Sequence, residues 1–282
     1  MNLKYVITCT IIGSSALIVW GGRRRIFKQK KKKIRAKWNE AGEGVVVLHQ
    51  FGRGKFCPNL SPFALKVESF LRLTGIKYVV DTDAPFGPKG KCPWITLNRI
   101  DTADSEFILE RLVNEFGIDL ESHLSKTEKA SAEMARIVAE EQLFWCVIYW
   151  RYWLDQCTSF LKSQTAMFSG LGKYIFLKFI TKSIRKKADA HGIGRHSEEE
   201  IFLITQKTLQ ILSDYLGPQS FFGGSHPCKA DCAIFGQLSQ LMWNAPDSKY
   251  EDLMKVNFPR LANYCKTMKD RLFPDWNDLL QA

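Results

Sequence analysis

Strand-forming segments occur in only one part of this chain, and that segregation constrains its fold more than any other feature. Three short runs rich in β-branched and aromatic residues are predicted to be strands: VVVLHQF at 45–51, IKYVVDT at 76–82 and WITL at 94–97. Helical segments at 61–75 and 105–117 separate and follow these runs. From Lys126 onward only helical periodicity remains. We therefore expect a small α/β domain with a parallel strand pair, followed by an all-helical domain.

The segment 61–75 carries clear start and stop signals for a helix. Ser61 is a favoured N-cap residue, Pro62 suits the first helical position, and Gly75 ends the apolar periodicity. Cys57 lies just ahead of this start. Both Cys57 and Ser61 have two interpretations: a reactive group at the positively polarised end of a helix, or part of an ordinary cap. Ser61 is the better candidate for a reactive role, and its first role is the cap.

The all-helical part is predicted to begin between residues 116 and 126. Its helices are expected as one long segment at 130–155, a second at 197–217, a shorter one after 221–227, and a last one at 250–272. Aromatic residues cluster in the long segment: Phe144, Trp145, Tyr149, Trp150, Tyr152 and Trp153. We interpret this cluster as core and domain-interface packing, with a wall for an apolar substrate as the alternative.

The basic excess of the chain is confined to its N-terminal segment. The formal net charge is +11, from 40 basic and 29 acidic residues. Residues 1–37 contain eleven of the basic residues and no acidic one, so residues 38–282 are formally neutral. General nucleic-acid binding requires a basic face on the folded part, and none is expected here.

An uncharged run of eighteen residues, from Tyr5 to Gly22, precedes most of those cations. At about 1.5 Å per residue, a helix of this length reaches across most of a hydrocarbon core of about 30 Å. We predict a transmembrane anchor at 1–22, a basic linker at 23–43 and a cytosol-facing body, because cations that directly follow such a run resist translocation. A cleavable signal peptide is the alternative. The cations of the linker are expected to bind anionic membrane lipid.

The eight cysteines have no spacing typical of a disulfide scaffold, so we expect them to be reduced. His226, Cys228 and Cys232 offer three soft ligands close in sequence, but their spacing is not that of a zinc motif. We therefore predict no resident metal. The chain contains no phosphate-binding loop, dinucleotide-binding fingerprint or nucleophile-elbow serine.

Three parts of the chain carry a resemblance to a known family: CPNLSPFALKVESFLRLTGIKY at 57–78, GKCPWI at 90–95, and FPRLANYC with LFPDW at 258–265 and 272–276. Over residues 44–275 the chain resembles the glutathione transferase superfamily, and within it the failed axon connections family, whose relatives are the metaxins. It is most similar to the cadmium-responsive (cadmium-inducible lysosomal) members. The resemblance implies a thioredoxin-like N-terminal domain at 44–120 and a helical C-terminal domain at 121–282.

The resemblance also implies a glutathione site. Ser61 corresponds to the helix-start position whose hydroxyl donates to the glutathione sulfur, which makes it the expected catalytic residue. Pro93 corresponds to a cis-proline, and the backbone of Cys92 before it pairs with the cysteinyl part of glutathione. Asp104 and Ser105 correspond to the pair that holds the γ-glutamyl end. Each position also has a purely structural interpretation, as a helix cap or as a turn that the fold requires.

In this fold the first helix start and the residue before the cis-proline are neighbours, so Cys57 and Cys92 form a candidate thiol pair for redox or metal chemistry. Two features depart from the family pattern. The segment 83–91 is too short for the helix that supplies further glutathione contacts. A cysteine, Cys228, replaces the hydroxyl residue of the capping box that ends at Asp231. Efficient catalysis is therefore not expected.

The sequence and the resemblance lead to two functional hypotheses. The first is a membrane-anchored protein of the response to cadmium, other heavy metals or xenobiotics. It binds glutathione, as substrate or ligand, or a thiol conjugate, with weak or no transferase activity. The second is a non-enzymatic adaptor at an organelle surface, similar to the metaxins. The resemblance implies the lysosomal membrane, and it leaves a homodimer or another protein partner open.

Overall fold

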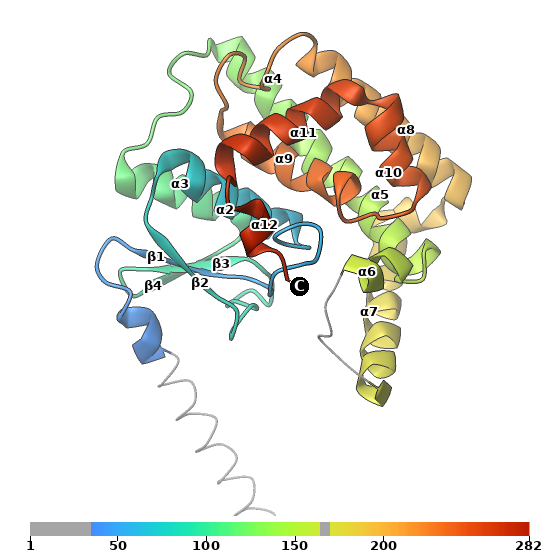
Figure 1. Cartoon of the computed structure of the whole chain (residues 1–282), viewed down its shortest axis with the longest axis horizontal. Coiled ribbons are helices and arrows are strands. Elements are labelled where there is room, and N and C mark those ends of the chain that lie inside the picture. Colours follow the sequence, from blue (N-terminus) through green and yellow to red (C-terminus); the bar gives the residue numbers. More distant parts are fainter. Residues whose placement is uncertain (1–34, 164–169, 282) are drawn as a thin grey trace, which may run out of the picture.

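The computed structural model describes residues 35–163 and 170–281, which form an α/β domain and a helical domain (Figure 1). The sheet of the first domain contains four strands: β1 (Val46–His49), β2 (Tyr78–Asp81), β3 (Trp94–Leu97) and β4 (Ile100–Ala103). Their order is β2-β1-β3-β4, with β1 and β2 parallel and the other two pairs antiparallel. The three predicted strands and the parallel pair are confirmed.

Strand β4 has no counterpart among the predicted strands. It forms a hairpin with β3 in which Leu97 lies opposite Ile100. The two residues between them, Asn98 and Arg99, have φ angles of +50° and +67°. Two successive positive φ angles are typical of a type I′ turn, which is usually recognised by the dipeptide Asn-Gly. Because arginine rather than glycine occupies the second position, the sequence does not indicate this hairpin.

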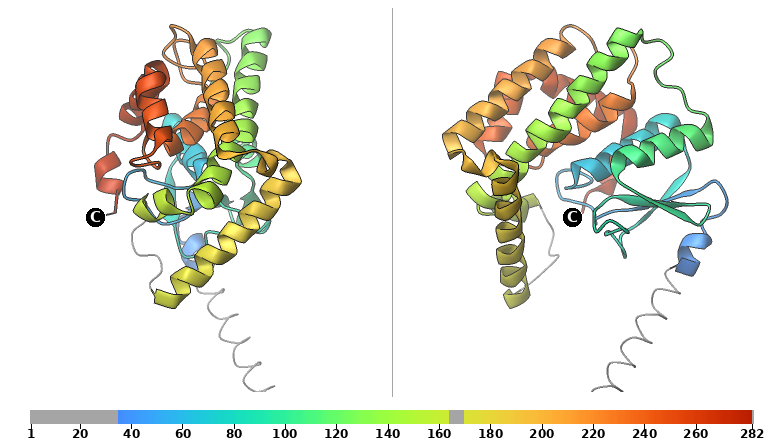
Figure 2. Two further views of the ribbon diagram at one scale, coloured as in Figure 1. Left: turned by 90° about the vertical axis from the view of Figure 1, so that its right-hand side faces the viewer. Right: turned by 180° about the vertical axis from the view of Figure 1, so that it is seen from behind.

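Helices α2 (Pro62–Thr74) and α3 (Ser105–Phe116) lie together on one side of the sheet (Figure 2). The predicted caps are present, because Ser61 precedes α2 and Gly75 ends it with a φ angle of +69°. Side chains alternate along the strands, so every second residue faces these helices. The core between the sheet and the two helices includes Val46, Leu48, Phe70, Leu71, Ile95, Leu97, Ile108 and Leu112.

The opposite side of the sheet carries His49 and Trp94. The loop between β2 and β3 contains no helix, as predicted, so these rings are covered from another part of the chain, where residues 35–39 are helical. Residues 35–43, which belong to the predicted linker, approach this side instead. The Trp38 ring packs edge-on against the His49 ring at 4.3 Å and the Trp94 ring at 5.2 Å between centroids.

The long helix predicted at 130–155 is present and begins a few residues earlier. It runs through α4 (Lys126–Ile137) and α5 (Phe144–Tyr149), with π-helical segments η1 (Val138–Leu143) and η2 (Trp150–Leu154) after each. Such π segments widen a helix locally and are frequent at functional sites. Here η1 and the first turn of α5 face the α/β domain and contribute to the site described below.

Further helices complete the second domain: α6 (Thr158–Ser163), α7 (Gly170–His191), η3 (Ile193–Arg195), α8 (Glu198–Leu216), α9 (Lys229–Met242), α10 (Lys249–Asp252), η4 (Leu253–Asn257), α11 (Pro259–Leu272) and α12 (Trp276–Leu279). The prediction of a single helix over 250–272 is wrong. The chain bends at Phe258, because Pro259 has no N–H group and cannot continue the preceding helix. Helix α7 has no counterpart among the predicted helices.

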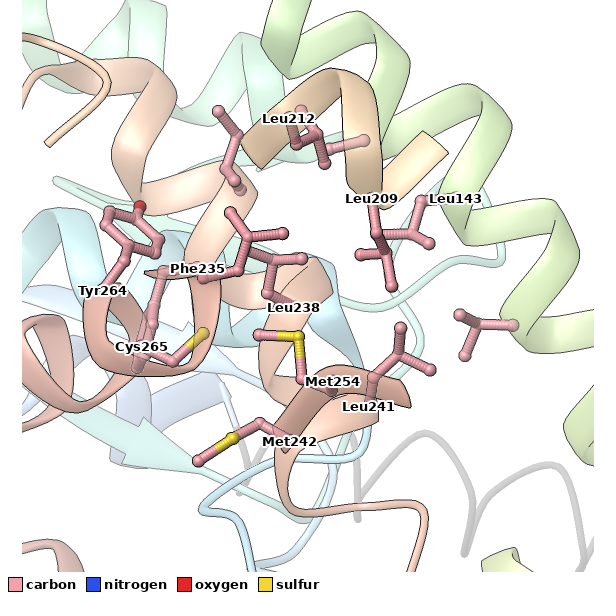
Figure 3. Packing of buried hydrophobic residues seen from close by; sticks show 14 of the residues in the cluster. Leu143, Leu209, Leu212, Phe235, Leu238, Leu241, Met242, Met254, Tyr264 and Cys265 are labelled. Atoms are coloured by element: carbon pink, nitrogen blue, oxygen red, sulfur yellow. The ribbon is translucent and has the colours of Figure 1, made fainter. Parts of the chain in front are cut away.

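Helix α9 lies at the centre of the second domain. All residues from 230 to 242 are buried, and Phe235 lies in one cluster with Leu209 of α8 (Figure 3). The helix also packs closely on α2. A Cβ atom at Gly236 would lie 2.4 Å from the carbonyl oxygen of Pro62, so only glycine allows this approach. The contact fixes the first turn of α2 against the second domain.

No helix within residues 35–163 and 170–281 combines the length and the apolar character needed to cross a bilayer. The predicted anchor at 1–22 and the first part of the predicted linker, 23–34, lie outside the described residues.

Candidate functional site

A groove with a volume of about 280 Å³ lies where the two domains meet. It is lined by Phe63 of α2; Lys91, Cys92 and Pro93 before β3; Asp104 and Ser105 at the start of α3; and Glu140, Glu141, Phe144 and Trp145 of the long helix. The register of β3 and β4 places Trp94 opposite Ala103. Pro93 and Asp104, which adjoin these two residues, therefore lie at the same edge of the sheet. The structure thus brings together Cys92, Pro93, Asp104 and Ser105, four of the five predicted glutathione-binding residues.

The peptide bond between Cys92 and Pro93 is cis, as the resemblance implies. The Cys92 thiol is half-buried, and burial raises its pKa to about 12. The thiol is therefore protonated at neutral pH, and a protonated thiol is a poor nucleophile. Cys92 therefore contributes its main chain, and not a thiolate, to the binding of a ligand in this groove.

Asp104 caps helix α3 with an unusual backbone conformation. Its Oδ1 accepts a hydrogen bond from the Glu106 backbone N–H at 3.1 Å, and its φ angle is +88°. A positive φ angle at a residue other than glycine costs about 1–3 kcal/mol and is most often found at functional sites. The first N–H groups of α3 carry partial positive charge, and Ser105 lies among them. This arrangement suits a carboxylate.

Ser61 is placed by the structure as a helix cap. Its Oγ accepts a hydrogen bond from the Ala64 backbone N–H at 3.3 Å, and its own N–H donates to Asn59 Oδ1 at 2.8 Å. Ser61 is 9% exposed and is not among the residues that line the groove. Its catalytic role stays a prediction, and the cap accounts for the contacts that the structure gives it.

Cys57 is fully buried and belongs to the core of the second domain. Burial raises the pKa of its thiol to about 12. Of the candidate thiol pair, Cys92 lines the groove and Cys57 does not. Both thiols are protonated at neutral pH, which disfavours metal binding because a metal needs the thiolate.

In the part of the chain that the structure describes, no three or more His, Cys, Asp or Glu side chains gather as metal ligands. Cys228 and Cys232 are buried in different core clusters, and His226 is exposed. The Asp231 carboxylate accepts a hydrogen bond from the Cys228 backbone N–H at 2.8 Å, so the acidic half of the capping box is present as predicted.

A network of buried ion pairs lies beside the groove and joins the two domains. Lys66 of α2 is 1% exposed, and its Nζ donates to Glu106 Oε2 and Glu140 Oε1, both at 2.7 Å. Arg136 pairs with Glu140 from the same helix. Lys229 of α9 pairs with Glu106, with 2.9 Å between Nζ and Oε1. We refer to these five residues as the Lys66 network.

The Lys66 network holds Glu106 in its charged form. Burial alone would raise the pKa of Glu106, but the cations of Lys66 and Lys229 outweigh burial and lower it to about 2. One sequence signal points to this network. Lys66 lies between Phe63 and Phe70 at helical spacing, and a cation on an apolar helix face requires an acidic partner.

The predicted aromatic cluster divides between the two roles considered for it. Phe144 and Trp145 line the groove, where the Phe144 ring is 4.9 Å from that of Phe63. The Trp145 ring stacks on His191 of α7 at 4.6 Å. The members that are buried in the core are Tyr149, Trp150 and Tyr152. The groove therefore has one aromatic wall, opposite the edge formed by the cis-proline.

Two models of glutathione S-transferase domains match parts of the chain. The model of the glutathione S-transferase N-terminal domain matches residues 62–158, and that of the glutathione S-transferase C-terminal domain matches residues 205–268. The Drosophila melanogaster protein Failed axon connections is 34% identical over 249 residues, which cover 83% of this chain and 60% of that protein. Mouse metaxin-2 is 22% identical, covering 76% of this chain and 82% of its own. The isoprene-epoxide glutathione S-transferase of a Rhodococcus strain is 28% identical, covering 65% and 81%.

Solved structures share the fold at low sequence identity. A β-etherase from Sphingobium has a TM-score of 0.58 and 15% identity, covering 82% of this chain and 99% of its own. A glutathione S-transferase from Methylobacterium radiotolerans, in complex with glutathione sulfonate, has a TM-score of 0.56 and 16% identity, covering 84% and 96%. A glutathione transferase from Burkholderia graminis, with two glutathione molecules bound per subunit, has a TM-score of 0.54 and 14% identity, covering 85% and 92%.

Proposed function

We propose that the groove binds glutathione or a thiol conjugate, with weak or no transferase activity, because models of the N-terminal and C-terminal domains of glutathione S-transferases match parts of this chain. The observation that carries the proposal is the convergence of Cys92, Pro93, Asp104 and Ser105 on one groove. The presence of glutathione or glutathione sulfonate in structures of the same fold supports it.

Glutathione is a tripeptide, and each of its ends has a chemically suited contact in this groove. The backbone of Cys92 pairs with the cysteinyl residue, as in a short β-bridge. The N–H groups at the start of α3 other than that of Glu106, together with the Ser105 hydroxyl, bind the γ-glutamyl carboxylate. The Asp104 carboxylate accepts a hydrogen bond from the ligand ammonium group. Lys91 lines the same groove and supplies a cation for the second carboxylate.

The groove is better suited to binding than to activating a thiol. Transfer of glutathione to an electrophile requires stabilisation of the thiolate. The hydroxyl assigned to that task, that of Ser61, caps α2 and does not line the groove. Phe144 and Trp145 provide an apolar surface for the organic part of a conjugate. A conjugate is therefore expected to bind more tightly than glutathione.

Calorimetric titration of the full-length protein with glutathione and with S-hexylglutathione tests the proposal. A double variant, Asp104→Ala with Ser105→Ala, removes two polar contacts and should weaken binding at least about tenfold. The matched control, Asp119→Ala with Ser122→Ala, changes an exposed Asp and a nearby Ser outside the groove and should bind as the wild type does. Equal affinity of the wild type and the Asp104/Ser105 variant would contradict the assignment of the site.

We further propose that residues 1–22 anchor the protein in a membrane, with lysosomes as the first candidate organelle and the body in the cytosol. The uncharged run followed by cations supports the anchor and its orientation. On intact lysosomes, added protease should then degrade the body, and protection of the body would contradict this orientation.

The resemblance to cadmium-responsive proteins supports a role in metal or xenobiotic stress. Cells lacking the protein should tolerate less cadmium, and unchanged tolerance would argue against that role.

The second candidate function is an adaptor without chemistry, at an organelle surface. The similarity to metaxin-2 over 76% of the chain favours it. One set of binding measurements distinguishes the two functions. If neither glutathione nor S-hexylglutathione binds the wild type while the protein still recovers a defined partner from detergent-solubilised membranes, the adaptor is the better description.

A further inference from the structure

Helix α7 presents large apolar side chains to solvent along one side. Tyr174, Ile175 and Phe179 are 63%, 58% and 72% exposed. Their spacing places them on one face of the helix. The other face packs on the second domain, where Leu177, Ile180 and Ile184 join the cluster of Tyr152, Cys157 and Phe160. The exposed apolar residues are therefore a separate surface and not an unfilled part of the core.

Cations accompany this apolar surface. Lys178, Lys182, Lys186 and Lys187 of α7 are exposed, and none of them forms an ion pair within the described residues. The Nζ of Lys178 lies 5.8 Å from the centre of the Tyr174 ring, so charge and aromatic surface adjoin. The sequence contains no acidic residue from 170 to 188. The face thus combines unpaired positive charge with exposed aromatic and aliphatic groups.

An anionic lipid surface matches both properties at once. Aromatic and aliphatic side chains on one face of a basic helix enter the boundary between headgroups and acyl chains. The long lysine side chains reach back to the phosphates, and each basic residue near an anionic surface adds to the attraction. A purely acidic protein surface would pair the lysines but leave three large apolar side chains in water.

The position of α7 agrees with such a contact. Its N-terminal half, which carries Tyr174, Ile175 and Phe179, projects beyond the body of the molecule (Figures 1 and 2). The first described residues, 35–39, lie at the same end of the molecule. The predicted anchor precedes them in the sequence by only a short segment. A membrane that holds the anchor would therefore face this half of α7.

We propose that the exposed face of α7, formed by Tyr174, Ile175 and Phe179 with Lys178, Lys182 and Lys186, docks on an anionic lipid bilayer. This contact is a second attachment to the membrane that holds the proposed anchor, and it rests on that anchor only for its orientation. A single attachment leaves the body free to rotate about the chain. Two attachments fix which side of the protein faces the lipid and keep the groove at a constant height above it.

Photocrosslinking of the full-length protein in vesicles tests the proposal. Phe179 is replaced by p-benzoylphenylalanine, and the control places the same group at Ile211 of α8, which is 56% exposed. Vesicles contain phosphatidylcholine alone or with phosphatidylserine. With phosphatidylserine, lipid adducts at position 179 should exceed those at position 211 at least about tenfold, because apolar residues of a docked helix lie at the acyl boundary.

A charge variant separates docking from mere proximity. Lys178→Gln, Lys182→Gln and Lys186→Gln together should lower the lipid adduct at position 179 at least about fivefold, as should omission of phosphatidylserine. The matched control changes three exposed lysines elsewhere, Lys129→Gln, Lys207→Gln and Lys266→Gln, and should leave the adduct unchanged.

Three other results would each overturn the proposal. A protein that floats with the vesicles but forms no lipid adduct at position 179 has its anchor and lacks the α7 contact. A protein that does not float lacks both attachments. A crosslink at position 179 to a second copy, formed equally without vesicles, would assign the face to a protein interface instead.

Discussion

Replacement of Lys66 by methionine removes the central charge of the Lys66 network with little change in side-chain volume. Lys66 is 1% exposed, and its partners Glu106 and Glu140 are 20% and 8% exposed. Removal of one partner of a buried pair typically costs about 3–5 kcal/mol. Arg136 and Lys229 still contact the two carboxylates, so we expect the lower end of that range, about 3 kcal/mol. For a chain of this size, Tm should fall by about 6–10 °C.

The pH dependence of stability separates this electrostatic loss from a packing defect. Glu106 has a pKa of about 2 in the folded protein, against an ordinary value of 4.5. Its contribution to the free energy of unfolding is therefore complete above pH 4.5 and is lost as the pH falls towards 2. The difference between the two pKa values corresponds to at most about 3 kcal/mol, which partial exposure of Glu106 reduces to about 2 kcal/mol. In Lys66→Met this acid-dependent loss should shrink to about 1 kcal/mol.

Denaturant unfolding at pH 7, and in steps down to pH 2.5, measures both effects. Lys249→Met is the matched control, since Lys249 forms an ion pair with Glu198 in which both side chains are nearly half exposed. It should cost less than about 1 kcal/mol. A double variant, Lys66→Met with Glu140→Gln, also removes the carboxylate left without its lysine and should recover about 1–2 kcal/mol. A loss at pH 7 below about 1 kcal/mol for Lys66→Met, or an unchanged acid profile, would refute the reasoning.

Three further predictions concern the groove and its support. Gly236→Ala should lower the free energy of unfolding by about 1–3 kcal/mol, because the added Cβ would lie 2.4 Å from the Pro62 carbonyl oxygen; an unchanged Tm would show that α9 can move. Ser61→Ala should cost about 1 kcal/mol of stability through the lost cap and leave the affinity for glutathione unchanged. A tenfold weaker affinity would instead make Ser61 a ligand contact. Cys92, whose pKa burial raises to about 12, should be alkylated by iodoacetamide at least about a hundredfold more slowly at pH 7 than a free cysteine, as followed by mass spectrometry of its peptide. A rate that levels off below pH 8 would contradict a protonated thiol.

The elements that could be predicted from the sequence are those with local signals. The strand at 46–49 is a β-branched run, and α2 has its cap residues at both ends, Ser61 and Gly75. Strand β4 has no such signal, because its hairpin depends on pairing with β3 around the positive φ angles of Asn98 and Arg99. Helix α7 escaped prediction because its solvent-facing side is also apolar, which blurs the helical pattern.

The residues of the candidate site could be predicted only in part. Cys92, Pro93, Asp104 and Ser105 were identified through the family resemblance, and their convergence follows from the pairing of β3 with β4. The Lys66 network could not be assembled from the sequence, because its members come from α2, α3, α9 and the long helix. Lys66 and Glu140, for example, are 74 residues apart. Pairings of that kind are decided by the packing of α9 on α2, which only the folded structure reveals.

The start of the described chain is attached to the sheet rather than free of it. Arg35 Nη1 lies 2.6 Å from Asp101 Oδ1, and Trp38 covers the buried ring of His49. Twelve residues, 23–34, therefore separate the predicted anchor from the attached start of the body. Twelve residues in fully extended conformation span at most about 40 Å, and less in any other conformation. With the proposed anchor in a bilayer, so short a segment keeps the body near the lipid surface, where the projecting half of α7 makes the proposed contact.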